Sequence, residues 1–283
     1  MNRLPIHKTI QILSALVEGN SLRSISRMLN IHRTTIMNVL VEAGKQAQEI
    51  LDTELVNIKS NYIQVDEIWT YVGKKKKRLT IEEKLYEDKT DLGDQYVFVA
   101  LDAETKLVTN YIVGKRSAEN TYSFLQDLKA RVSTEFQLSS DSFKPYKYAV
   151  KRTFGNSIAY AQIHKMFGEE VREQKRYSPA RITGVNIIPI FGEPELKHIS
   201  TSYVERQNLT MRMQMRRFTR LTNAFSKKLD NLKYAVALHF FYYNFMRNHK
   251  TIRCTPVMKA GISKSFWTWE QFLSYGKDYR QVA

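Results

Sequence analysis

The segment at residues 62–72 constrains this chain most, because it combines a strand pattern with two central carboxylates. Asp66 and Glu67 stand there among branched and aromatic residues that are typical of β-strands. A buried lone carboxylate is costly unless it is paired, neutralised or bound to a metal ion. Because neighbouring strand residues face opposite sides of a sheet, we expect Asp66 alone to face a site. Glu67 is then structural, or acts only by supporting the site.

Further strands and helices follow in an order that predicts the fold class. Strand patterns occur at residues 96–101, 107–113 and 136–140, and residues 161–167 could add another. Helical patterns occur at residues 121–132, 200–217 and 229–246. This order predicts an α/β (α+β) fold with a mixed sheet and flanking helices.

Two further carboxylates are placed where they could join Asp66. Asp141 closes the strand of residues 136–140, and Glu205 lies in the helix of residues 200–217. Hard cations such as magnesium prefer oxygen ligands, and a pair of them can activate an attacking hydroxyl and stabilise a leaving oxygen. We expect Asp66 to bridge two ions and the other two carboxylates to hold one each. The single cysteine, Cys254, excludes a four-cysteine zinc site and an internal disulfide.

The first 48 residues predict a DNA-binding head of three helices, the last two joined by a tight turn. Short polar and basic residues open the third helix, where a recognition helix meets DNA. A plain three-helix bundle for protein contacts is the alternative. The candidate DNA-contacting residues are Arg33, Thr34, Thr35 and Asn38. Residues 49–60 form the expected helical connector.

Charge favours a polyanionic partner. Lys and Arg number 44 against 28 Asp and Glu, which gives a formal net charge of +16. Residues 206–253 hold eleven bases and one acid, Asp230; a solvated helical surface is the alternative, but it explains so one-sided an excess less well than it explains mixed charge. The basic run at residues 74–78 reads as a loop that either touches phosphates or is simply solvated.

Three segments together resemble transposases of the insertion-sequence-one family. They are residues 65–73 around Asp66, residues 140–146 around Asp141 with Ser142 where relatives often have glycine, and residues 205–212 with the basic stretch that follows. The resemblance spans about residues 61–250. It implies a ribonuclease-H-like core in which Asp66, Asp141 and Glu205 are the catalytic triad and hold two Mg²⁺ or Mn²⁺ ions.

The same resemblance implies what such a protein does. Family members cut DNA at mobile-element ends and join the ends to target DNA. We therefore expect double-stranded DNA as the partner (terminal repeats and target), a homodimer or larger assembly on it, and a bacterial, cytoplasmic, nucleoid-associated protein. The DNA contacts expected from the body are Lys144, Arg206, Asn208, Arg212, Arg216 and Arg217. Asn208 could instead position Glu205, and Arg212 could balance the carboxylates or form a simple helix ion pair.

Two other functions stay open at this point: a non-catalytic DNA-binding regulator with the same fold, and a structure-selective nuclease that cuts without joining. We expect no secretory signal and no membrane span, because the most apolar stretch is too short. Residues 251–283 should form a tail packed on the core, anchored by Trp267 and Trp269. Trp69 and Tyr71 are expected to be packing residues rather than base-stacking groups.

Overall fold

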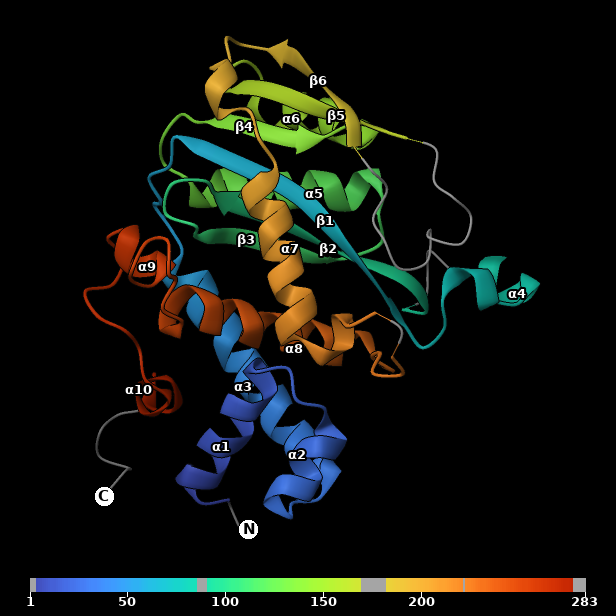
Figure 1. Cartoon of the computed structure of the whole chain (residues 1–283), viewed down its shortest axis with the longest axis vertical. Helices are drawn as coiled ribbons and strands as arrows, with labels where there is room; N and C mark the ends of the chain where they lie inside the picture. The colour runs from blue at the N-terminus through green and yellow to red at the C-terminus, as the bar shows by residue number, and fades with distance from the viewer. Residues whose placement is uncertain (1–3, 86–90, 169–181, 221, 277–283) are drawn as a thin grey trace.

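The computed structural model describes residues 4–85, 91–168, 182–220 and 222–276. One six-stranded sheet with the order β3-β2-β1-β4-β5-β6 forms the centre of the molecule (Figure 1). β1, β4 and β5 run parallel, whereas β2, β3 and β6 are antiparallel to their neighbours. An antiparallel β1-β2-β3 meander continued by parallel strands on the other side of β1 is the ribonuclease-H-like arrangement. The fold class expected from the sequence is therefore confirmed. The strands are β1 (Tyr62–Val72), β2 (Gly93–Asp102), β3 (Val108–Gly114), β4 (Gln137–Asp141), β5 (Ala159–Phe167) and β6 (Ile182–Phe191).

Helices α5 (Ala118–Arg131) and α6 (Lys144–Phe154) cover one face of the sheet. Ile63 and Val65 of β1 point to this face and share a buried cluster with Phe124 of α5 and Tyr146 of α6. Burial of such side chains stabilises the layer by roughly 1.5–3 kcal/mol each.

Helices α7 (Ser202–Gln214) and α8 (Leu229–Phe241) lie on the other face, with α7 crossing the sheet over β1 (Figure 1). Ile68 and Val72 of β1 point to this side and join a larger cluster that includes residues of α7 and α8. α8 continues into a π-helical turn, Tyr242–Met246. Because successive side chains of β1 point to opposite faces of the sheet, this strand contributes to two separate hydrophobic cores.

The N-terminal helices are α1 (Ile6–Val17), α2 (Leu22–Leu29) and α3 (Arg33–Glu54). Ser21 caps α2 by accepting the Ser24 N–H over 3.0 Å, and Asn30 ends it in the left-handed conformation with φ of 53°. α3 continues past residue 48 without a break, and its second half packs along α8. Most of the expected connector is therefore the end of this same helix.

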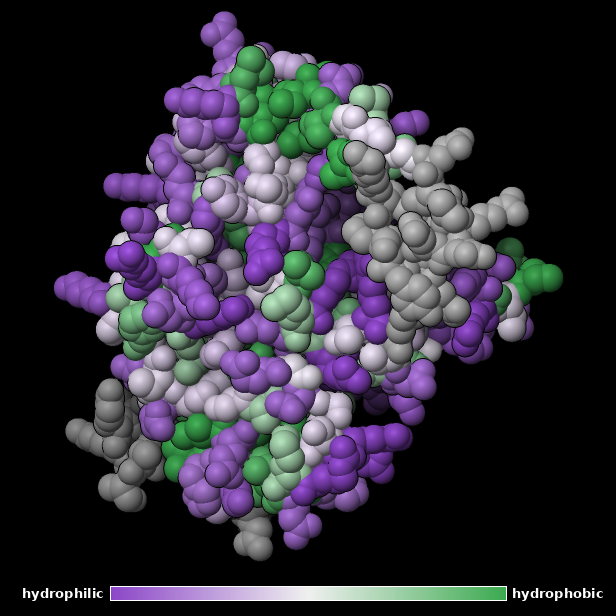
Figure 2. Space-filling model, viewed as in Figure 1, coloured by the Kyte–Doolittle hydropathy of each residue, from purple (hydrophilic) through white to green (hydrophobic). Residues whose placement is uncertain are grey.

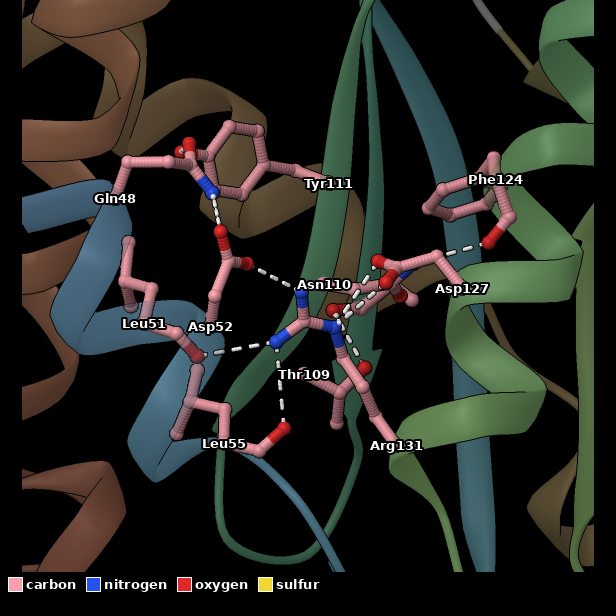
Figure 3. A network of polar contacts seen from close by, with 11 residues as sticks. Gln48, Leu51, Asp52, Leu55, Thr109, Asn110, Tyr111, Phe124, Asp127 and Arg131 are labelled. Carbon is pink, nitrogen blue, oxygen red and sulfur yellow. Dashed lines mark hydrogen bonds and ion pairs between the residues drawn. The ribbon is translucent and has the colours of Figure 1, made fainter. Parts of the chain in front are cut away.

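A polar network ties α3 to the sheet (Figure 3). Arg131 of α5 forms ion pairs with Asp127 and Asp52, and its guanidinium also donates to the carbonyls of Leu51 and Leu55 at the end of α3. Tyr111 of β3 donates to Gln48 of α3 over 2.5 Å. α3, β3 and α5 are thus held together by side chains from three separate parts of the chain.

Three elements before α7 were not expected from the sequence: the short helix α4 (Ile81–Leu85), α6 and the edge strand β6. Two short helices, α9 (Pro256–Lys259) and α10 (Trp269–Ser274), also follow α8. Trp269 belongs to the larger core cluster, and Trp267 lies edge-on to Phe241 and Phe245. Within the described ranges, no helix is both long and apolar enough to cross a membrane.

Candidate metal centre and nucleic-acid surface

Asp66 and Asp141 are brought together by the parallel pairing of β1 and β4. The last register pair joins Val65 to Ser140, so each aspartate is the next residue on its strand. Asp141 is oriented by its own turn, since its Oδ1 accepts the Phe143 N–H over 2.9 Å. Oxygens of the Asp66, Glu67 and Asp141 carboxylates all lie within 4.8 Å of one another.

The inclusion of Glu67 corrects our expectation that it could not share a site with Asp66. The two side chains do leave β1 on opposite faces: Asp66 accepts from the Asn208 amide of α7, and Glu67 from Arg116. β4 ends at Asp141, however, and leaves the edge of β1 open at this point. Both carboxylates can therefore approach Asp141 around that edge.

Burial and mutual repulsion set the protonation of this cluster. Burial raises the pKa of Asp66 to about 7, helped by the charges of Glu67 and Asp141. Burial also raises the pKa of Glu67 to about 7, while Arg116, 2.8 Å from Glu67 Oε2, opposes the rise. Three crowded carboxylates, two of them with raised pKa values, favour a bound cation that would compensate their charge.

Glu205 lies on α7 but is not gathered into this cluster. Its carboxylate accepts the Thr201 hydroxyl over 2.5 Å and pairs with the ammonium of Lys165 on β5. Its charge contributes only slightly to the raised pKa of Asp66. The third predicted ligand therefore faces the same region and is held by a competing lysine.

The residues present fit a hard divalent cation. All donors are carboxylate oxygens, which Mg²⁺ and Mn²⁺ prefer. Among the described residues, Asn208 Oδ1 is a buried oxygen without a hydrogen-bond partner, whereas the Glu67 carboxylate has the buried Tyr146 hydroxyl beside it. A buried unsatisfied acceptor is unfavourable, and a cation in this cluster would relieve it.

The predicted DNA-contacting residues fall into three groups. At the start of α3, Arg33, Thr34 and Asn38 are exposed and Thr35 is half-buried. On the body, three bases are exposed, Lys144, Arg206 and Arg216. The remaining three, Asn208, Arg212 and Arg217, are buried or half-buried; Asn208 binds Asp66, and the two arginines line a hollow beside β1.

Several residues of this region were missed. Lys75 and Arg78 line the same hollow. Trp69 and Tyr71 pack as half-buried residues, since Trp69 lies against Tyr71 and Tyr71 stacks on Phe225, and their rings also line this hollow. The basic run after a strand with aromatic residues was the available signal. Arg116, which binds Glu67, gave no signal, because nothing in the sequence places the residues after β3 beside β1.

Comparisons with known proteins give only distant likenesses. No family model and no curated protein matches the chain. Among solved structures, the piggyBac transposase synaptic complex with hairpin DNA is similar over 97% of this chain and 73% of that one, with 10% identity and a TM-score of 0.38.

Two Mos1 structures show partial likenesses. The Mos1 strand transfer complex matches 54% of this chain at 14% identity, with a TM-score of 0.22. The Mos1 transposase paired-end complex with left transposon end also matches 54%, at 13% identity and a TM-score of 0.18. The match spans 57% and 58% of the Mos1 chains. Similarities this low carry no weight for function, which has to be derived from the side chains themselves.

Proposed function

We propose that this chain is a DNA transposase of the insertion-sequence-one kind, which cleaves mobile-element ends and joins them to target DNA. One observation carries the proposal: Asp66 in the middle of β1 and Asp141 at the end of β4 meet on adjacent parallel strands of a ribonuclease-H-like sheet. Glu205 lies on the helix that crosses this face. In α/β sheets, chemistry is placed at such strand ends.

The proposed roles follow from the contacts of each carboxylate. Asp66, Asp141 and Glu205 would hold the divalent ions, with Glu67 supporting them from the opposite face. A divalent cation bound there would activate the attacking oxygen and stabilise the leaving oxygen of a phosphodiester. Asn208 orients Asp66, and Arg116 limits the charge that Glu67 and Asp141 build up, lying 3.6 Å from Asp141.

Exposed basic and polar side chains form the proposed DNA-binding surface. Hydrophilic residues gather on the face that carries α7 (Figure 2). Arg33, Thr34, Thr35 and Asn38 at the start of α3 would read the element end, and Arg206 and Arg216 would hold phosphates near the carboxylates. Both ends of an element have to be handled together, so we expect a dimer or larger assembly on DNA. Affinity should fall steeply with salt, because phosphate contacts release counterions.

The test is a strand-transfer assay with the full chain. The substrate is a labelled duplex of the DNA that flanks the chain's own coding region, with a target plasmid and Mg²⁺ or Mn²⁺. Wild type is compared with Asp66→Asn, Asp141→Asn and Glu205→Gln. Asp230→Asn, an exposed carboxylate on α8, is the matched control.

Each outcome assigns one function. Joined product that is lost in the three variants and kept in Asp230→Asn supports the transposase. Cleavage without joining assigns a nuclease instead. Specific binding with neither cleavage nor joining under both metals assigns a DNA-binding regulator.

A further inference from the structure

A hollow of about 700 Å³ opens beside β1, beyond the carboxylates. Pairing with β4 ends at Val65, so among the described residues this edge of β1 has no strand partner until Val72 bridges to Ser226. The walls come from β1 itself, the basic turn at residues 73–78, the end of α7 and the segment around residues 217–225. This volume lies within the roughly 300–1,000 Å³ of small-molecule sites and is far too small for a duplex.

The charge of the walls points to an anionic ligand. Six basic side chains line the hollow, and none of its described lining residues is acidic. Lys74 pairs with Glu83, but in the described chain no carboxylate lies within ion-pair distance of the four arginines. Like charges gathered in a partly desolvated wall repel one another unless an anion lies between them. The four arginines are Arg78, Arg212, Arg217 and Arg220.

Arg217 places a buried guanidinium in the wall of the hollow. Its side chain is buried strongly enough that burial lowers the pKa of the guanidinium to about 10. Its one hydrogen bond within the described structure is to Ser226 Oγ, over 2.7 Å. A guanidinium has five N–H donors, so most of this buried donor set is available to a phosphate.

Aromatic rings form the rest of the hollow. Tyr71 stacks on Phe225 with 5.0 Å between ring centroids, and Trp69 lies 5.6 Å from Tyr71. The ammonium of Lys75 lies 5.4 Å from the Trp69 ring centroid and 5.5 Å from that of Tyr71. A site for an inorganic anion needs no aromatic wall. Proteins bind unpaired nucleotides with aromatic rings, on which the nucleobases stack, and with basic side chains between the rings, which contact the phosphates.

The hollow is also placed correctly with respect to the carboxylates. Trp69 follows Asp66 by three residues, about 10 Å along a strand that rises roughly 3.3 Å per residue. Arg212 lines the hollow and feels the charge of Asp66. A nucleic-acid strand that lies over Asp66 would therefore reach the hollow within a few nucleotides.

We propose that this hollow receives an unpaired nucleotide of the strand on which the carboxylate centre acts, with its base against Trp69 and Tyr71. Arg78 and Arg217 would hold the adjoining phosphates. The inference rests on the proposed function, since it names the form of DNA that the site engages: an end that is opened or frayed beside the scissile bond. Extruding a base from a duplex loses its stacking and pairing, and contacts with the aromatic rings and arginines of the hollow would offset this loss.

The experiment measures binding and needs no catalysis. The full chain in EDTA is titrated with a fluorescent 12-nucleotide oligothymidylate, a blunt duplex of mixed sequence, and the same duplex with four unpaired thymidines at one 3′ end. Dilute dTMP and ATP serve as competitors. Trp69→Leu, Tyr71→Leu and the exposed Arg78→Ala are compared with wild type. Tyr148→Leu, an exposed aromatic residue on α6, is the matched control.

We expect the overhang duplex and the oligothymidylate to bind at least about fivefold more tightly than the blunt duplex, because a stacked base contributes substantially to affinity. Trp69→Leu, Tyr71→Leu and Arg78→Ala should remove this preference, and Tyr148→Leu should keep it. Intrinsic fluorescence should be quenched on binding in wild type and far less in Trp69→Phe, since Trp267 and Trp269 lie elsewhere.

Three results would overturn the inference: equal affinity for blunt and unpaired DNA, a preference that Arg78→Ala and Trp69→Leu leave unchanged, or mononucleotides that bind as tightly as the oligonucleotide. The last would make the hollow a free-nucleotide site. Because binding is read without metal, loss of strand transfer alone would not affect this result. Conversely, intact strand transfer without tighter binding of unpaired DNA would reject the role of the hollow and leave the proposed transposase function standing.

Discussion

The side-chain amide of Asn208 donates to Asp66 Oδ2 over 2.8 Å, so a residue of α7 fixes the central carboxylate of β1. The bond leaves Asp66 Oδ1 for a cation and links the helix that carries Glu205 to the strand that carries Asp66. Asn208 thus orients a proposed metal ligand through a hydrogen bond without being a ligand itself, as supporting residues do in metal sites.

Asn208→Ala should weaken metal binding and activity by about 10- to 100-fold, the range for loss of such a supporting contact. Mn²⁺ titration followed by calorimetry checks the affinity, and the strand-transfer assay checks the rate. Arg206→Ala, two residues away on α7 and exposed, is the control, and its metal affinity should be unchanged. Equal affinities for Asn208→Ala and wild type would contradict the role.

Lys165 competes with a cation for Glu205. The two side chains are 24% and 41% exposed, and such pairs contribute only about 0–1 kcal/mol. Lys165→Met should therefore tighten Mn²⁺ binding by no more than about fivefold and change stability little. Lys197→Met, which removes an exposed pair with Glu195, should leave metal affinity unchanged. Weaker binding in Lys165→Met would show that the lysine supports the site instead.

The stability of the metal-free protein should fall as pH rises. The folded state raises the pKa of Asp66 from 3.8 to about 7, so it binds a proton that the unfolded chain has lost. The resulting stabilisation is complete below about pH 4 and is lost as pH rises through 7. At pH 8 in EDTA, Asp66→Asn should be more stable than wild type by on the order of 1–3 kcal/mol.

Urea unfolding at pH 5 and pH 8 measures this difference. The variant and wild type should lie closer together at pH 5, where wild-type Asp66 is protonated. Saturating Mn²⁺ should stabilise wild type at pH 8 and not Asp66→Asn, because the ionised carboxylate is then a ligand. A stability difference that does not change with pH would contradict the raised pKa.

Most of the sheet could be predicted from the sequence, because its strands carry strong local patterns. β1 begins and ends where expected, at Tyr62 and Val72. α6 was missed, although Tyr146, Ala149, Val150 and Phe154 have helical spacing and Pro145 stands in the first turn, a position that proline favours. β6 was missed because this edge strand is largely exposed and has no buried face to give an alternating pattern.

The candidate site was predictable only to the level of residue types. Asp66 follows from its place in the middle of a strand pattern and Asp141 from a strand end, and both are local properties. The approach of Glu67 depends on where β4 stops, and its pairing with Arg116 depends on a loop from the far side of β2. Alternation along one strand cannot reveal either contact, because both arise from the arrangement of other elements.

Gly44 is required where α3 crosses α8. A Cβ at this position would lie 2.3 Å from the Cβ of Tyr234 and 2.6 Å from its carbonyl oxygen. Gly44→Ala should therefore push the helices apart and lower the unfolding free energy by about 1–3 kcal/mol, despite the better helix propensity of alanine. Thermal unfolding of Gly44→Ala and wild type measures the loss, and equal stability of the two would contradict the close approach. Because the backbone of Tyr234 is itself 2.6–2.7 Å away, shortening the Tyr234 side chain should not rescue the variant.

Arg131 is the centre of the network that joins α3 to the sheet (Figure 3). It is 13% exposed, and it satisfies two carbonyls at the end of α3 as well as Asp52 and Asp127. Removing the guanidinium leaves these acceptors and Asp127 without their cation, so Arg131→Met should lower the unfolding free energy by about 3 kcal/mol. Arg131→Lys should recover only part of this loss, because one ammonium cannot reach four acceptors. Lys129→Met, on the same helix but bound to the Thr153 carbonyl, is the control and should cost less.

Since α3 carries both the proposed DNA-reading residues and this junction, Arg131→Met should also weaken binding to the element end while leaving metal affinity unchanged. Urea unfolding and Mn²⁺ titration of the same three variants test both statements, and a destabilisation equal to that of Lys129→Met would show that the network has no special role.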